Sequence, residues 1–170
     1  MALDLGHFEK IRAIATASRL VAIGGVRVRS ESQVTAFDPT SNKRLWGVAL
    51  PAHVFGACVL DDVVLCAAAD GLVYALRATN GDVAWSVAAH TGGVSGVVKA
   101  PDGKTFVTTG ADGALRIWTT AKREEKAAFV LSSDPLHAVA ISPDGLMVGA
   151  AGDDGVVRVV TLADGTRREM

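Results

Sequence analysis

The feature of this sequence that most constrains its fold is a segment that recurs at a nearly fixed spacing. Residues 68–76, 110–118 and 152–160 align without gaps, and each copy carries an Asp-Gly pair followed by a short apolar run. The glycines of these pairs, Gly71, Gly113 and Gly155, are 42 residues apart. A fainter copy occupies residues 30–37, where Ser32 lies 39 residues before Gly71. Periods of about 40–45 residues are typical of arrays of small β-sheets.

Within each period, short runs rich in Val, Ile, Thr and Ala alternate with turn residues. The third copy has such runs at 94–99, 104–109, 114–118 and 124–130, with Pro-Asp-Gly at 101–103 between the first two. Proline presets φ, Asp bonds the local backbone and Gly accepts positive φ, so these tripeptides predict turns. No window keeps a period of 3.6 residues. The sequence therefore predicts an all-β fold: a β-propeller with four blades of four-stranded antiparallel sheets, at roughly residues 7–50, 51–89, 90–131 and 132–170.

Two propeller families resemble different halves of the chain. The second half resembles WD repeats in Ala89-His90, in its Pro-Asp-Gly turns and in the run from Gly110-Ala-Asp-Gly to Leu-Arg-Ile-Trp118. The first half resembles quinoprotein-type repeats, in which a strand and a turn lead to a docking tryptophan, as at residues 34–46 and 73–85. The resemblance is specific for the fold and says little about function, because propellers host many unrelated activities.

The WD resemblance implies one structural set of hydrogen-bonded side chains. Its members are His90, Thr109, Asp112 and Trp118. Thr119 and Thr161 stand where that family has an Asp after its Trp, and Val160 replaces the fourth Trp, so the set is expected to form once. The quinone-dependent enzymes of the other family need carboxylate ligands and a Cys pair that this sequence lacks. The resemblance therefore implies the fold without the cofactor.

The remaining chemical residues recur with the repeat, which favours structural roles. His7, His53 and His90 each stand where a blade begins, so the ring would separate them, and no ligand cluster accompanies them. We expect Asp70, Asp112 and Asp154 to cap turns, His137 to lie in the core or between blades, and Arg116 and Arg158 to face solvent. No nucleophile elbow and no phosphate-binding glycine loop is present. We therefore expect no catalytic residues, no metal and no cofactor.

Composition narrows the possible partners and the compartment. Lys plus Arg number 17 and Asp plus Glu 18, so the chain lacks the basic excess of a nucleic-acid binder. No apolar stretch is long enough to cross a membrane. Cys58 and Cys66 are interpreted as buried thiols in a reducing cytoplasm, although a disulfide across a hairpin is conceivable.

These observations favour a non-catalytic scaffold that binds other proteins through its loop face. The alternative is an enzyme or small-ligand binder with a site in the central channel, which polar groups with perturbed pKa values would reveal. We expect Trp46 and Trp85 to pack between blades. Phe8 and Phe55 each follow a loop histidine, and either an exposed interface role or core packing fits them.

Four blades leave two apolar blade faces uncovered, which predicts association. Blades of this length close in rings of six to eight, so we expect a homodimer forming an eight-bladed ring about a twofold axis. Residues 1–6 match the phase of an outer strand and are expected to complete the partner's last blade. A different half-propeller as partner, or a longer parent chain, would also close the ring. The predicted interface consists of Met1, Ala2, Leu3, Asp4, Leu5, Gly6, Phe8, Phe55 and Met170.

Overall fold

The computed structural model describes residues 8–17, 20–27 and 32–170, and within them every regular element is a β-strand. The strands are β1 (Phe8–Ala17), β2 (Leu20–Arg27), β3 (Ser32–Phe37), β4 (Arg44–Leu50), β5 (Val54–Leu60), β6 (Val63–Ala68), β7 (Leu72–Arg77), β8 (Val83–Ala88), β9 (Val94–Lys99), β10 (Thr105–Gly110), β11 (Ala114–Thr119), β12 (Glu125–Val130), β13 (Leu136–Ile141), β14 (Met147–Gly152), β15 (Val157–Thr161) and β16 (Arg167–Glu169). These residues contain no helix that is long and apolar enough to cross a membrane.

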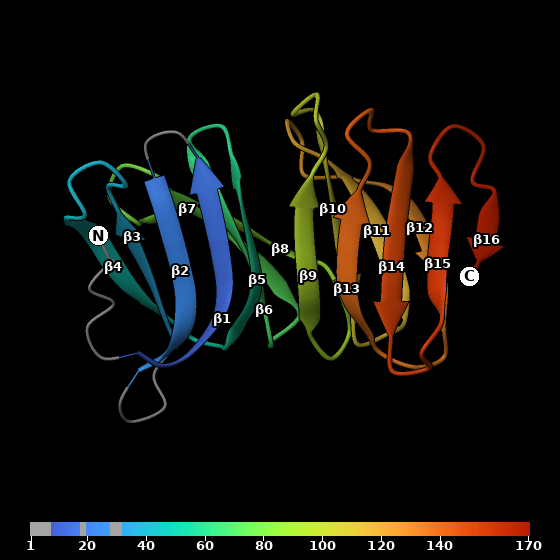
Figure 1. The fold of residues 1–170 in the computed structure, drawn as a ribbon, viewed down its shortest axis with the longest axis horizontal. Coiled ribbons are helices and arrows are strands. Elements are labelled where there is room, and N and C mark those ends of the chain that lie inside the picture. The colour runs from blue at the N-terminus through green and yellow to red at the C-terminus, as the bar shows by residue number, and fades with distance from the viewer. Residues whose placement is uncertain (1–7, 18–19, 28–31) are drawn as a thin grey trace.

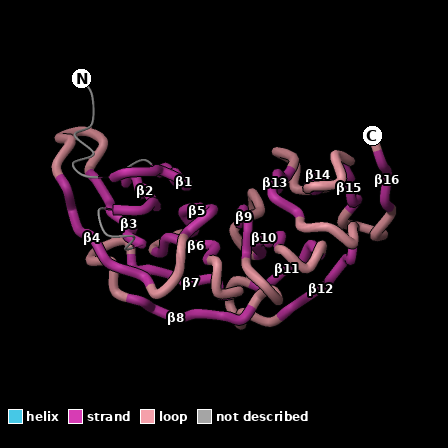
Figure 2. Tube along the Cα trace, turned by 90° about the horizontal axis from the view of Figure 1, so that it is seen from below, coloured by secondary structure: helices cyan, strands magenta, loops and turns pink. Residues whose placement is uncertain are grey.

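The strands form four antiparallel sheets, each of four strands in chain order. The sheets stand side by side, from the blue sheet β1–β4 to the red sheet β13–β16 (Figure 1). Seen from below, they make an open arc with β1, β5, β9 and β13 on the concave side and β8 and β12 on the convex side (Figure 2). The predicted four-bladed, all-β propeller architecture is confirmed. We call β1, β5, β9 and β13 the inner strands.

The turn residues do what their chemistry predicts. In three blades the Asp before the turn glycine accepts the backbone N–H two residues further on, at 3.1–3.2 Å. The glycines that follow have φ of +86°, +68° and +72°, which a side chain would strain. The predicted capping role of Asp70, Asp112 and Asp154 is therefore confirmed.

The core lies between the blades. One apolar cluster joins each neighbouring pair of sheets, and its members come from the facing sides of the two sheets. Trp46 is buried between the first two blades, and its indole N–H donates to the carbonyl oxygen of Ala78 at 2.8 Å. Trp85 packs similarly towards Phe106 of the third blade, with ring centroids 6.1 Å apart. The predicted packing of both tryptophans between blades is confirmed.

Glycines allow the inner strands to approach one another closely. A Cβ on Gly56 of β5 would lie 3.2 Å from the Cα of Gly96 on β9. Such contact leaves no room for side chains between the two strands at this point. The blades therefore converge on the concave side of the arc.

Cys58 and Cys66 are free thiols. Cys58 pairs with Leu65 and Cys66 with Ala57, so the two side chains lie on opposite faces of the sheet and cannot bridge across the hairpin. Burial raises the pKa of the Cys58 thiol to about 12 and raises that of Cys66 as well. Both groups therefore pack as small apolar side chains.

Candidate functional site

Four polar side chains form a continuous relay between the second and third blades. The indole N–H of Trp118 donates to the hydroxyl of Thr108 at 2.9 Å, and this hydroxyl lies 2.8 Å from Nε2 of His90. Nδ1 of His90 lies 2.7 Å from a carboxylate oxygen of Asp112. The partners assign the neutral Nδ1–H tautomer, in which Nε2 accepts from Thr108 and Nδ1–H donates to Asp112.

The hydroxyl in this relay is that of Thr108, and the sequence-based choice of Thr109 is wrong. Alternation along β10 places Thr108 on the face that it shares with Phe106 and Trp118. Thr109 points to the opposite face, where its hydroxyl lies 3.4 Å from that of Ser95. A shift of one residue along a strand moves a side chain to the opposite face of the sheet. Because Thr108 and Thr109 are adjacent and of the same type, the sequence does not show which of them faces His90.

The Asp of each turn also pairs with the residue four positions later. Asp112 contacts Arg116 at 2.8 Å, and Asp154 contacts Arg158 at 2.6 Å. Both arginines reach a second carboxylate and are mostly buried, so the expectation that they are solvated is wrong. In the fourth blade Ser132, 42 residues after His90, takes the place of the histidine and donates to Asp154 at 2.7 Å. The loop that contains Ser132 is therefore also hydrogen-bonded to the turn of its blade, through fewer side chains than in the third blade.

The relay makes stability depend on pH. Burial lowers the pKa of His90 more than Asp112 raises it. Partial burial of Asp112 acts to raise the pKa of that carboxyl, but hydrogen bonds from His90 and Arg116 outweigh it and hold the pKa at about 2. In both cases the unfolded chain binds more protons, so the free energy of unfolding falls as the pH is lowered.

We expect acidification from about pH 8 to about pH 5 to destabilise the protein, because His90 is neutral when folded and charged when unfolded. The Asp112 contribution is lost only at lower pH, towards about pH 2. Urea titrations across this range measure the effect. His90→Gln, which retains an amide for hydrogen bonding, should give a flatter profile between about pH 8 and pH 5. An unchanged slope would show that folding does not shift the pKa of His90.

A second arrangement repeats on the concave side of the arc. Every inner strand has a register shift at the same place, between Phe8 and Lys10, Val54 and Gly56, Val94 and Gly96, and Leu136 and Ala138. The extra residues are Glu9, Phe55, Ser95 and His137. A β-bulge re-aims a side chain and recurs beside functional sites. In the second, third and fourth blades, the same bulge therefore presents residues of different chemistry: Phe55, Ser95 and His137.

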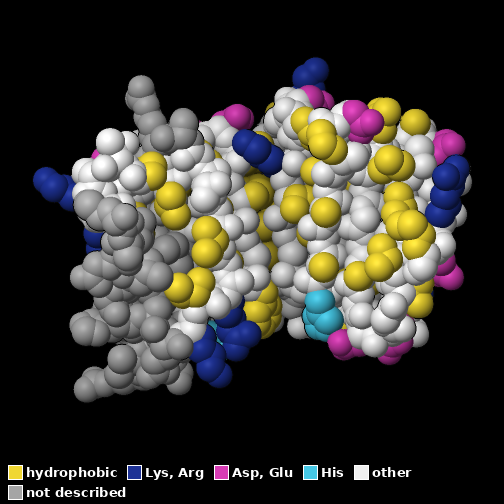
Figure 3. Space-filling model, in the orientation of Figure 1, with side chains coloured by type: hydrophobic (Ala, Val, Ile, Leu, Met, Phe, Trp, Pro, Cys, Tyr) yellow, Lys and Arg dark blue, Asp and Glu magenta, His cyan; other side chains and the backbone are white. Residues whose placement is uncertain are grey.

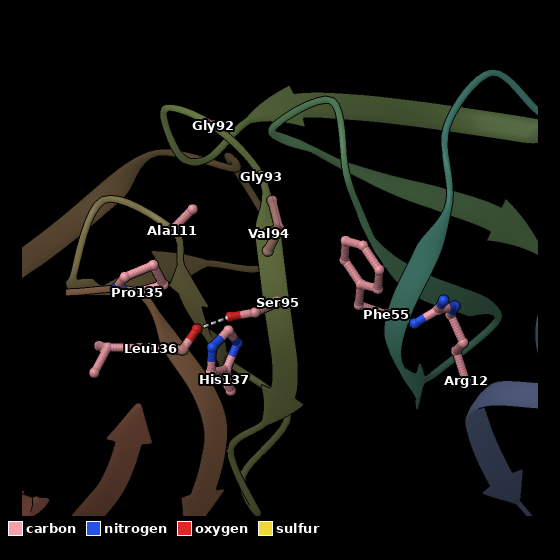
Figure 4. Close-up of a pocket in the computed structure, with 10 residues that line it drawn as sticks. All are labelled: Arg12, Phe55, Gly92, Gly93, Val94, Ser95, Ala111, Pro135, Leu136 and His137. Carbon is pink, nitrogen blue, oxygen red and sulfur yellow. Dashed lines mark hydrogen bonds between the residues drawn. The ribbon is translucent and has the colours of Figure 1, made fainter. Parts of the chain in front are cut away.

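Three of these bulged residues line one cleft of about 350 Å³. Phe55 stands on one side with Arg12 beside it, and Ser95 and His137 stand on the other, below the loop of Gly92 and Gly93 (Figure 4). The space-filling view shows a shallow hollow here, with basic surface on the β1 side and histidine surface on the β13 side (Figure 3). The cleft therefore has walls of different chemistry.

The groups around the cleft are held by specific contacts. The guanidinium carbon of Arg12 lies 5.6 Å from the centre of the Phe55 ring. Phe55 is 38% exposed. The Ser95 hydroxyl donates to the backbone carbonyl of Leu136. Nε2 of the exposed His137 lies 2.7 Å from Asp153. The prediction that His137 is a core or packing residue is wrong, because the bulge turns its side chain out of the sheet.

Other predicted interface residues do not meet at this cleft. Residues 1–6 and the side chain of Phe8 lie outside the described part of the structure. Met170 is exposed, and its N–H bonds the carbonyl of Val157 at the far end of the arc. Sequence reasoning missed Arg12 and Ser95, because only the strand register reveals which residues the bulges re-aim. Among the described residues, no group of three or more His, Cys, Asp or Glu side chains could hold a metal ion.

Repeated four-stranded blades with Asp-capped turns define a β-propeller repeat protein. The chain belongs to the PQQ_2 family, whose model, described as outer membrane protein assembly factor BamB, matches residues 7–117. A WD40 model, described as WD domain, G-beta repeat, matches residues 126–160. The two models name the two repeat types that the sequence resembles, so the predicted repeat families are confirmed. The PQQ_2 match extends to residue 117, over a blade whose sequence resembles WD repeats.

Curated relatives share parts of their length with this chain. An uncharacterized WD repeat-containing protein of Synechocystis is 30% identical over 89% of this chain and 41% of its own length. Shk1 kinase-binding protein 15 of Schizosaccharomyces pombe is 27% identical over 75% of this chain and 39% of its own. Cilia- and flagella-associated protein 43 of Chlamydomonas reinhardtii is 37% identical over 43% of this chain and 4% of its own. The chain thus spans less than half the length of these relatives.

A solved structure shares the fold. A chain in the crystal structure of a mitotic checkpoint complex superposes with a TM-score of 0.83 at 17% sequence identity. The match covers 94% of this chain and 52% of that chain. At this identity the likeness establishes the arrangement of the blades and nothing about partners.

Proposed function

We propose that the chain is a non-catalytic propeller scaffold that binds other proteins in the cytoplasm. One observation carries the proposal: none of the described side chains with a shifted pKa lines the concave cleft. His90, Asp112 and Asp154 are committed to bonds that hold loops and turns. Catalytic sites gather perturbed ionisable groups in a cleft, whereas this chain places them in its framework.

The comparisons support the same class of function. The name of the Schizosaccharomyces pombe relative states that it binds a kinase. Affinity purification of the tagged protein from its native cells, followed by reconstitution with the recovered protein, tests the proposal. We expect a protein partner that binds the purified chain again. Failure of every recovered protein to bind again, together with turnover of a small-molecule substrate, would favour the enzyme alternative.

We also propose that the ring is completed by a second copy of this chain. The sheet β13–β16 packs one side against β9–β12, and its other side, which we call the free face, is mostly apolar. The free face consists of Ala138, Ala140, Met147, Gly149, Ala151, Val157, Val159, Thr161 and Arg168. The corresponding side of the third blade is buried against the apolar side of the fourth blade. By analogy, an apolar blade side would fit the free face. The match covers about half of the structural neighbour, a length that two copies of this chain would reach.

We expect Val157→Glu to abolish association, because a charge would enter an apolar blade interface. Light scattering at micromolar concentration should give twice the 17.5 kDa chain mass for the wild type and the single mass for the variant. Val83→Glu is the matched control, since Val83 is an exposed valine on the outer strand β8. A wild-type protein that is folded and monomeric at this concentration would overturn the homodimer.

A further inference from the structure

The β1 side of the concave cleft carries exposed basic side chains. Arg12 and Lys10 are exposed on β1, and no carboxylate of the described residues lies within ion-pair distance of either. The guanidinium of Arg12 rests near the face of the Phe55 ring, which holds the cation at the mouth of the cleft. A bound carboxylate could contact this cation without displacing a carboxylate of the described residues.

Carboxylates lie beside the opposite wall. Asp153 lies 2.7 Å from Nε2 of His137, which lines the cleft. Asp134, beside the cleft residue Pro135, is also exposed. A long polyanion crossing the whole cleft would meet these carboxylates, whereas a short segment with one acidic group at the β1 side would not. This asymmetry disfavours nucleic acid and favours a peptide.

Apolar residues line part of the cleft. Phe55 faces Val94 across the cleft, and Pro135 and Leu136 border it (Figure 4). A cavity of about 350 Å³ is at the small end of the range for ligand sites, so it accommodates a few side chains of a partner. An exposed aromatic ring beside an arginine is the combination that dominates many protein interfaces.

We propose that this cleft binds an acidic linear segment of a partner protein, with a carboxylate at Arg12 and a large apolar side chain against Phe55. The inference rests on the proposed scaffold function and names the chemistry of the partner. The bulges at Phe55, Ser95 and His137 supply the three contact points from three successive blades. The cleft lies on the inner side of the arc, so in a closed ring it would form part of the central channel.

A phage-displayed library of random peptides, selected against the wild-type protein, tests the proposal. We expect enrichment of peptides with Asp or Glu close to an aromatic or large aliphatic residue. Fluorescence anisotropy of a synthetic enriched peptide should show affinity reduced about tenfold or more by Arg12→Glu and by Phe55→Ala. A peptide with Lys in place of its acidic residue should bind Arg12→Glu better than it binds the wild type.

Arg123→Glu is the matched control, because Arg123 stacks on Trp85 at 5.4 Å in the same manner but on a different surface. It should leave the affinity unchanged. Enriched peptides without acidic residues, or equal effects of Arg12→Glu and Arg123→Glu, would overturn the cleft while leaving the scaffold function intact. Failure to enrich any peptide, or displacement of the peptide by single-stranded RNA at similar concentration, would also overturn it. The scaffold proposal itself is tested separately, by reconstitution with the native partner.

Discussion

Replacing Thr108 with valine is expected to lower the free energy of unfolding by about 2–4 kcal/mol. The substitution preserves shape but removes the hydroxyl that joins the indole N–H of Trp118 to Nε2 of His90. Both groups are then left in a protein interior without a partner, and each unsatisfied buried group costs about 1–3 kcal/mol. Urea-induced unfolding followed by tryptophan fluorescence measures the loss.

Thr109→Val is the matched control for this experiment. Thr109 is equally buried, but its hydroxyl makes one long contact, at 3.4 Å, to a serine that has other acceptors. We expect a cost of about 1 kcal/mol or less. If the two substitutions cost the same, the relay contributes no more than a single weak hydrogen bond.

The fold was accessible from the sequence because the same local chemistry occurs in every period. Asp and Gly mark each turn at 70–71, 112–113 and 154–155, and the structure bonds each Asp to the backbone as expected. The first blade repeats less regularly, since β1 spans ten residues and contains two register shifts. The copy at residues 30–37 is fainter because Glu31-Ser32 stands where the other copies have Asp-Gly.

The candidate site was less accessible, because it depends on register. A bulge adds one residue to a strand and leaves no distinct residue type behind, so Phe55, Ser95 and His137 share no sequence signature. The same limit explains the errors at Thr109 and His137. The ion pairs of Arg116 and Arg158 were missed for another reason: they lie four residues after their Asp, on the next strand, and such a contact requires the turn geometry.

The final prediction compares one position in two successive blades. Leu115 of β11 and Val157 of β15 are 42 residues apart and occupy the same place in their sheets. Leu115 is fully buried by the fourth blade, whereas Val157 is 41% exposed on the free face. We expect Leu115→Ala to cost about 2–5 kcal/mol at any protein concentration, because it leaves a cavity between blades.

The cost of Val157→Ala should instead depend on protein concentration. When the protein is dilute and monomeric, the free face is open and the change should cost about 0.5 kcal/mol or less. When the ring is closed, Val157 is buried as Leu115 is, and the truncation should weaken assembly and lower the melting temperature of the associated form. Thermal unfolding of both variants over a range of concentrations measures the difference. A small cost for Val157→Ala at every concentration would mean that no blade of a second copy covers this face.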